Sequence, residues 1–408
     1  MDRRFGVLAH RSAVRVGGAA RVVLRLQGEA QYGFGGVTLM DRGSNSSPWH
    51  QVTRIAWLSG GLVAVSQPGP LVKIFAGVGN HVLLAQFNLR AYPELVGALR
   101  HFGYTVLGMT FITSTDEASG LASPQFFAQS FEGVWRAKDA QQNWRRIAFH
   151  AGHKDMMLLS DVAARIASGL SSGQTRLQHL CQAYAVQLRS QVRSLPFKAH
   201  TRFKDTNSPT VYLAIHAMFW ELAVLRDTLA EFAARFAFEL TGIATMRGLV
   251  GSLKKRDAAN ELRDELLEAS SEHNLGWLSS FSAYRNLFTH GAPLQDAAGV
   301  SFAVLDNEVL KDGAAVPIIY YPLPADAANL SRKRSAGPLY ESFAELIGSI
   351  SDKRPTKNIE PDALDYLAVT FDRLAGLAQK LLRSSPVAPD DIVLTEADIV
   401  GEIRVDGS

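Results

Sequence analysis

The sequence predicts an α+β protein, and three features of its residue pattern support that fold class. From about residue 4 to residue 114, short apolar runs alternate with glycine and proline turn signals, which is typical of strands. From about residue 123 onward, apolar residues recur at three- and four-residue steps, as in bundled helices. Between residues 299 and 322 this helical pattern is interrupted. We therefore expect a mixed α/β domain over 1–120, a helical domain over 121–385 and a tail over 386–408.

In the first domain, the apolar runs Ala20–Leu26, Gly61–Val65 and Leu71–Phe75 are predicted to be strands, because turn signals bound each of them. A helix is expected at Tyr92–His101, followed by a strand at Thr105–Thr113. No glycine-rich loop in this region carries the lysine of a nucleotide-binding motif. The domain is therefore predicted to be a small mixed sheet without a nucleotide loop of that type.

In the second domain, the strongest helix signal begins at Ser208-Pro209, a capping serine with proline at the first helical position. Another helix is expected to begin near Pro361, and two more at about Leu253–Ala269 and Asn274–His290. A β-hairpin is expected before the last helix, formed by Val300–Leu305 and Val316–Tyr321 on either side of a turn. Together these elements predict a helical bundle with an inserted hairpin.

Composition limits the class of protein further. The hydrophobic fraction of 47% and the charged fraction of 20% are ordinary for a globular protein, and the net charge is +3. Cys181 is the only cysteine, which excludes a disulfide framework and a cysteine-rich zinc site. No run reaches the roughly 18 consecutive apolar residues that a membrane span needs. We expect a cytoplasmic protein without a membrane segment.

The segment 281–291 reads F-S-A-Y-R-N-L-F-T-H-G and contains the most informative motif. In it, Arg285 is followed directly by the polar Asn286 and, five positions after the arginine, by His290. Other Arg and His pairs, such as Arg145 and His150, have the same gap. Only the pair at 285 and 290 combines a following Asn with a position at the end of a predicted helix.

This motif resembles that of the HEPN superfamily, whose RNases carry Arg, then a polar residue, then His four to six positions after the Arg. The resemblance implies a four-helix bundle, attack by the RNA 2′-hydroxyl, no metal or other cofactor, and two motifs meeting in a homodimer. It also implies an acidic residue on an earlier helix that contacts the motif arginine. Glu221 is the candidate for that acid, with Asp227 as the second choice.

The residue types fit this chemistry independently of the family. Histidine titrates near neutral pH and can act as acid or base at an RNA oxygen. Arginine offers a planar fork of donors to phosphate oxygens. Asn286 and His290 are four apart, so they share one face of a helix. The motif therefore predicts a metal-independent endoribonuclease, and family analogy suggests a toxin or an antiphage-defence enzyme.

Two basic clusters are expected to bind RNA phosphates, although charge runs are often only solvated surface. They consist of Lys254, Lys255, Arg256, Arg332, Lys333 and Arg334. The N-terminal domain is expected to receive a regulatory ligand or partner, an inference that depends on analogy alone. The alternative for the whole protein is a non-catalytic module of the same type that binds RNA or protein.

Two further patterns are weaker. Residues 169–173 read G-L-S-S-G and match the nucleophile elbow of serine hydrolases around Ser171. That elbow requires a preceding strand, and the preceding stretch is predicted to be helical, so a polar linker between two helices is favoured. A local group of His150, His153 and Asp155 has two types of metal ligand but no obvious further ligand. We favour surface histidines near a helix start.

Overall fold

The computed structural model describes residues 21–22, 52–78, 82–132, 135–192, 198–256, 260–272, 276–291, 293–294, 302–352, 360–392 and 403–404. Pro48–Asp390 forms one compact unit, and residues 1–47 with 391–408 form another. In the smaller unit, β1 (Arg21–Val22) pairs antiparallel with β11 (Ile403–Arg404). Everything that follows concerns the larger unit.

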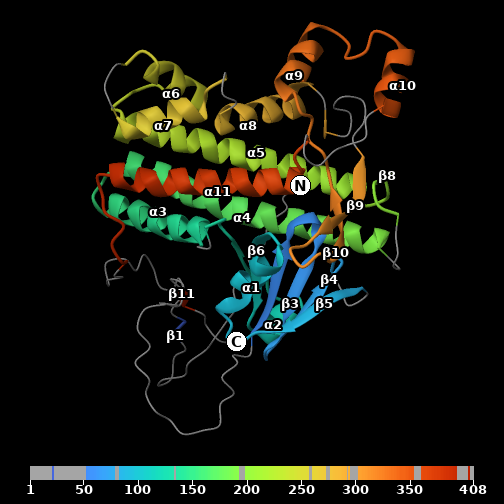
Figure 1. The fold of residues 1–408 in the computed structure, drawn as a ribbon. Coiled ribbons are helices and arrows are strands. Elements are labelled where there is room, and N and C mark those ends of the chain that lie inside the picture. The colour runs from blue at the N-terminus through green and yellow to red at the C-terminus, as the bar shows by residue number, and fades with distance from the viewer. Residues whose placement is uncertain are drawn as a thin grey trace. The chain divides into compact units, whose positions relative to one another are not determined.

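The N-terminal part of the larger unit is a six-stranded sheet in which every neighbouring pair is antiparallel. The strand order is β5-β4-β3-β2-β6-β7, and helix α1 (Glu94–Phe102) connects β5 to β6 (Figure 1). A short helix, α2 (Thr115–Ala118), follows β6. The strands are β2 (Thr53–Leu58), β3 (Val63–Ser66), β4 (Leu71–Phe75), β5 (Leu83–Asn88), β6 (Val106–Ile112) and β7 (Gln125–Ala128).

The strands expected around residues 61–65, 71–75 and 105–113 are confirmed, as is the helix expected at 92–101. The division expected at residue 120 falls between β6 and β7, which are neighbours in this sheet. The sheet also shares one buried apolar core with the helices that follow it. The larger unit therefore includes the sheet, the helices and the first residues of the expected tail.

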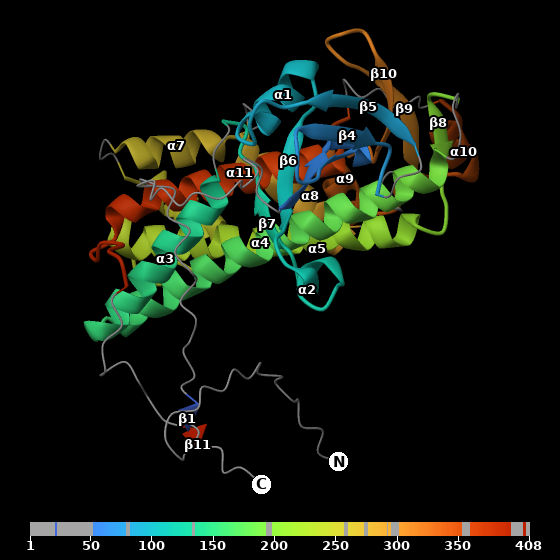
Figure 2. The ribbon, with the colours of Figure 1, turned by 90° about the horizontal axis from the view of Figure 1, so that it is seen from below.

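The longest helices of the helical part pack together: α3 (Arg136–His153), α4 (Met157–Gln191), α5 (Ser208–Phe232) and α11 (Ala363–Leu381). Helix α4 packs against α3 and α5, and α11 packs against all three (Figure 2). The buried Trp144 on α3 donates from Nε1 to the Ala378 carbonyl of α11 over 3.0 Å. The mixed α and β composition and the helical C-terminal region are confirmed.

Helix α4 runs through the residues that we expected to form a linker. That expectation was wrong, because Gly169 and Gly173 are buried inside a continuous helix. A β-carbon at position 173 would lie 2.5 Å from the Phe371 ring of α11, closer than atoms can approach. The glycine therefore permits close packing of two helices rather than a turn in the chain.

The start of α5 also differs in detail from the expectation. The helix begins at Ser208 as predicted, but no side chain caps its first turn from the N-cap position. Instead, Asp205 Oδ1 accepts from the backbone N–H groups of Asn207 and Ser208, both over 3.0 Å. The Ser208 hydroxyl points back to the same carboxylate over 3.1 Å. Asp205, rather than Ser208, thus organises this helix start.

A three-stranded sheet stands beside the bundle, with order β10-β9-β8. The expected hairpin is confirmed as β9 (Ala303–Val309) and β10 (Ala315–Tyr320), and β8 (Thr201–Phe203) pairs with β9. Of the helix expected over 253–269, the C-terminal part is present as α7 (Glu261–Ala269), and a separate helix, α6 (Met246–Leu253), ends where the expected helix was to begin. Helices α8 (Trp277–Asn286), α9 (Ala327–Ala336) and α10 (Phe343–Asp352) complete the unit, and the last two were not predicted.

Asp362, fully buried before α11, joins the bundle to the hairpin. It accepts from the backbone N–H of Tyr321 over 2.7 Å and from the Tyr184 hydroxyl of α4 over 3.0 Å. Asp365, one turn along α11, accepts from Ser59 next to β2 over 2.6 Å. Burial and the nearby Asp365 charge raise the pKa of Asp362 to about 7. The sheet, the hairpin and two bundle helices therefore meet at one polar cluster.

The segment Ser208–Ala237, which is α5 with its terminal turn, is long enough to cross a membrane and contains an 18-residue window with a mean hydropathy of 1.2. Half of that window is buried inside the protein. A core helix meets the same criterion. The position of α5 between α4, α8 and α11 accounts for its apolar character.

Candidate active site

The motif lies at the end of α8, which packs on α5 and is anchored by aromatic side chains. Phe281 is fully buried, and its ring stacks on Phe219 of α5 with centroids 5.8 Å apart. Tyr284 lies across the Tyr366 ring of α11 at 5.0 Å. Phe288 meets Phe219 edge-on at 5.2 Å. These contacts bury one face of α8 and leave the neighbouring face, which carries the motif, toward solvent.

The three motif residues converge. One guanidinium nitrogen of Arg285, Nη1, lies 3.1 Å from the Asn286 side-chain oxygen and 3.2 Å from Nε2 of His290. Asn286 and His290 are exposed, and Arg285 is half-buried. An arginine nitrogen can only donate, so Nε2 of His290 is the acceptor in this contact. The three side chains therefore lie together at the end of α8.

The backbone explains why residues five apart meet. After Asn286, the helix widens into a single π-helical turn over Leu287–Gly291. In a π turn, hydrogen bonds join residues five apart, so Arg285 and His290 lie one above the other. The pair Arg145 and His150 has the same spacing on the regular helix α3, and there His150 Nε2 instead contacts the Asp390 carbonyl at 3.0 Å. The π turn is therefore what distinguishes the motif pair.

Arg334 of α9 lies beside the motif. Helix α9 packs on the π turn, and a β-carbon built on Gly291 would lie 3.8 Å from Cβ of Arg334. The Nε atoms of Arg334 and Arg285 are both buried without a hydrogen-bond partner. Within the described part of the chain, neither guanidinium forms a salt bridge with a carboxylate. Two arginines without acidic partners next to a histidine make a place that suits an anion.

Glu221 and Asp227 both lie on α5, the helix that packs against α8. Among the described residues, neither forms a hydrogen bond or ion pair with Arg285, whose two partners are Asn286 and His290. Asp227 accepts from Arg226 over 2.9 Å and from the Met246 backbone N–H over 3.1 Å. The acidic contact implied by the HEPN resemblance is thus not formed in this arrangement.

The two basic clusters occupy different places. Arg332, Lys333 and Arg334 lie on α9 against the motif, and the first two are exposed. Lys254, Lys255 and Arg256 are exposed after α6, and Arg256 donates to the Phe238 carbonyl over 2.8 Å. Helix α6 packs on the C-terminal half of α5, whereas the motif packs on its N-terminal half. The α9 cluster is the one that adjoins the motif.

His216 of α5 is a residue that the sequence pattern did not single out. Its Nε2 accepts from the Leu294 backbone N–H over 3.1 Å, and its ring lies 5.7 Å from that of Phe288. Burial lowers the pKa of His216, which keeps it neutral and able to accept. It fixes the chain on both sides of His290. No local pattern marks such a residue, because its partners lie more than seventy positions away in the sequence.

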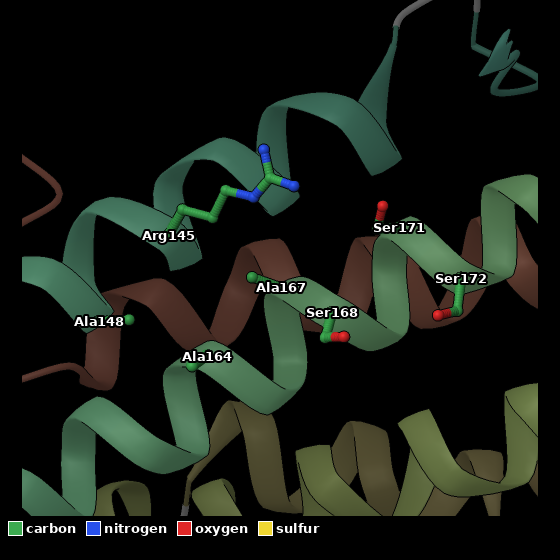
Figure 3. A pocket seen from close by; sticks show the side chains of 7 residues that line it. All are labelled: Arg145, Ala148, Ala164, Ala167, Ser168, Ser171 and Ser172. Atoms are coloured by element: carbon green, nitrogen blue, oxygen red, sulfur yellow. The ribbon is translucent and has the colours of Figure 1, made fainter. Parts of the chain in front are cut away.

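The hydrolase hypothesis around Ser171 is not supported. Ser171 lies in the middle of α4, with no strand before it. It lines a hollow of about 360 Å³ between α3 and α4, with Ser168, Ser172 and Arg145 (Figure 3). No histidine lines this hollow, so the serine has no base beside it.

Among the described residues, no group of three or more His, Cys, Asp or Glu side chains is arranged to hold a metal ion. His150 contacts a backbone carbonyl, and the His153 ring packs on Phe149 at 4.4 Å. These histidines, in the last turn of α3 rather than at a helix start, therefore have structural contacts. Comparisons of the chain with protein-family models, with curated proteins and with solved structures find no match.

Proposed function

We propose that the protein is a metal-independent endoribonuclease of the HEPN type, with its active site at Arg285, Asn286 and His290. The observation that carries the proposal is the contact of Arg285 Nη1 with both other side chains on a solvent-exposed π turn. The HEPN resemblance implies a helical bundle, and the packing of the motif helix α8 on α5, which itself packs on α4 and α11, is in keeping with the proposal. The site faces solvent, so it is accessible to a polymer.

In the proposed reaction, the RNA phosphate binds between Arg285 and Arg334, replacing the contact between Arg285 and His290. Nε2 of His290 then takes the proton of the 2′-hydroxyl. The 2′-oxygen attacks phosphorus, and the bond from phosphorus to the 5′-oxygen breaks. The products are a 2′,3′-cyclic phosphate and a 5′-hydroxyl, with the 5′-oxygen taking a proton from solvent or from a second site.

The arginines stabilise the additional negative charge on the phosphoryl oxygens in the transition state. Asn286 orients Arg285 through its side-chain oxygen. The exposed Arg332 and Lys333 on the same helix as Arg334 extend the positive surface along the RNA. By family analogy, we propose a homodimeric cytoplasmic enzyme that acts as a toxin or in defence against phage.

The alternative is a non-catalytic module that binds RNA or protein through the same surface. The contact between Arg285 and His290 favours it in one respect, because the two side chains partly satisfy each other. A binding module needs the arginines but not the proton transfer by His290. The two functions therefore differ in the effect of a His290 substitution.

The test is cleavage of total RNA by the full chain in the presence of EDTA. We expect the wild type to cut RNA and the Arg285→Ala/His290→Ala variant to lose activity by at least about a thousandfold, given typical losses of acid–base and charge stabilisation. The Arg145→Ala/His150→Ala variant is the matched control, since it removes a pair of the same spacing from α3. Equal cutting by all three proteins, or RNA binding without cutting, would exclude the nuclease.

A further inference from the structure

A second hollow lies on the sheet side of the molecule, away from the motif. It measures about 250 Å³ and is lined by residues of α1, the start of β6, the segment after β7 and the turn of the β9–β10 hairpin. Its side chains combine two cations with two aromatic rings. The lining residues are Arg100, Gly103, Tyr104, Thr105, Val106, Phe131 and Lys311.

Tyr104 is the unusual member of this group. Its side chain is only 5% exposed, yet its hydroxyl is buried without a hydrogen-bond partner. A buried hydroxyl left unpaired costs free energy, so such groups are uncommon in folded proteins. Burial and the nearby Asp312 charge raise the pKa of Tyr104 to about 12, so the phenol keeps its proton at neutral pH. The wall of the hollow therefore contains a hydrogen-bond donor that has no partner in the free protein.

Both cations are held at the hollow by backbone contacts rather than by acids. Arg100 donates from Nη2 to the Ser130 carbonyl over 2.7 Å, next to Phe131. Lys311 Nζ donates to the Arg100 carbonyl over 3.1 Å. Within the described residues neither cation is in a salt bridge, and each keeps further donors. Asp312 is the acid that faces this group, and its Oδ1 accepts from the Ala314 backbone N–H.

We propose that this hollow binds a small phosphate-bearing molecule such as a nucleoside monophosphate. Arg100 and Lys311 would bind the phosphate oxygens, the Tyr104 hydroxyl would donate to the ligand, and the half-exposed Phe131 ring would stack on its base. The volume is below the roughly 300–1,000 Å³ of pockets for larger ligands, so the ligand is small. Lys311 belongs to the hairpin and Arg100 to α1, so the ligand fastens the hairpin to the sheet domain.

The test is isothermal titration of the full chain with inorganic phosphate, AMP and adenosine. We expect AMP to bind, phosphate to bind more weakly, and adenosine to bind at least about tenfold more weakly than AMP, because it lacks the charged group. Adenosine binding as tightly as AMP, or no binding of either phosphate compound at millimolar concentration, would overturn the proposal.

Two variants locate the site. Tyr104→Phe removes a hydroxyl that has no partner in the free protein, so its melting temperature should be equal or higher while AMP affinity falls about five- to tenfold. Lys311→Gln should lower AMP affinity by about tenfold or more. Lys73→Gln, at an exposed lysine on β4 of the same sheet, is the control and should bind as the wild type. Unchanged affinity in both pocket variants would place the ligand elsewhere.

Discussion

Around the motif, the contribution of each side chain depends on its neighbours more than on its type. Arg285, Asn286 and His290 are close in sequence, so a local pattern was sufficient to bring them together as candidates. Arg334 was predicted only as one of six basic residues, and its position beside Gly291 distinguishes it from the others. His216 was missed altogether, because its contacts with Phe288 and Leu294 arise only when α5 and α8 pack.

The position of Arg334 leads to a prediction about RNA cleavage. Arg334→Gln should lower kcat/KM for RNA by about 10- to 100-fold, since a charge-assisted hydrogen bond contributes about 1.5–3 kcal/mol. Arg332→Gln changes the exposed arginine two positions earlier and should reduce kcat/KM by less than about fivefold, mainly at low salt. Initial rates at several salt concentrations provide the comparison. Equal losses in the two variants would mean that α9 supplies only general positive charge.

At the scale of elements, the sequence predicted the strands and the helices around Ser208 and Pro361 because their hydrophobic periods are regular. The prediction from sequence failed at α4, because the glycines and serines of residues 169–173 suggested a linker between two helices. The glycines are required by the neighbouring helices: Gly169 approaches Leu225 and Gly173 approaches Phe371. Those contacts connect distant parts of the chain, so no local pattern indicates them.

The close approach at Gly173 can be tested by stability. Gly173→Ala should lower the free energy of unfolding by about 1–3 kcal/mol, because the added methyl group overlaps the buried Phe371 ring. Gly97→Ala is the matched control, as Gly97 also lies within a helix but has open space at its β-carbon. It should be neutral or stabilising by up to about 1 kcal/mol. Urea unfolding of both variants measures the two changes in the free energy of unfolding. An unchanged value for Gly173→Ala would show that α4 and α11 are less tightly packed.

At the scale of the whole molecule, Asp362 and Asp365 connect the sheet, the hairpin and the bundle. The sequence located the start of the last helix near Pro361, but not this connection. From the sequence, an aspartate just before a helix is predicted to be an N-cap residue. Asp362 does have that role, since it accepts from the Leu364 and Asp365 backbone N–H groups. Its burial and its contacts with Tyr184 and Tyr321 depend on the complete fold.

This connection predicts how stability depends on pH. The pKa of Asp362 rises from 3.8 to about 7 on folding, so between these values the folded chain holds a proton that the unfolded chain has lost. Its contribution should therefore make the free energy of unfolding fall as pH rises from about 4 to about 7, by up to about 1.4 kcal/mol per pH unit, and then level off. Asp362→Asn should lack this component. The measurement is the free energy of unfolding by urea, determined for the wild type and for Asp362→Asn at several pH values in that range. The same pH dependence in both proteins would contradict the expectation.

The most direct test of the central claim is the cleavage of a defined RNA by the wild type and by His290→Ala, with EDTA present and with analysis of the new RNA ends. We predict that the wild type produces 2′,3′-cyclic phosphate and 5′-hydroxyl ends, and that His290→Ala still binds the RNA but cuts it at least about a hundredfold more slowly. Cleavage at the same rate by His290→Ala, or ends of another chemistry, would contradict the assignment of the π turn as a nuclease active site.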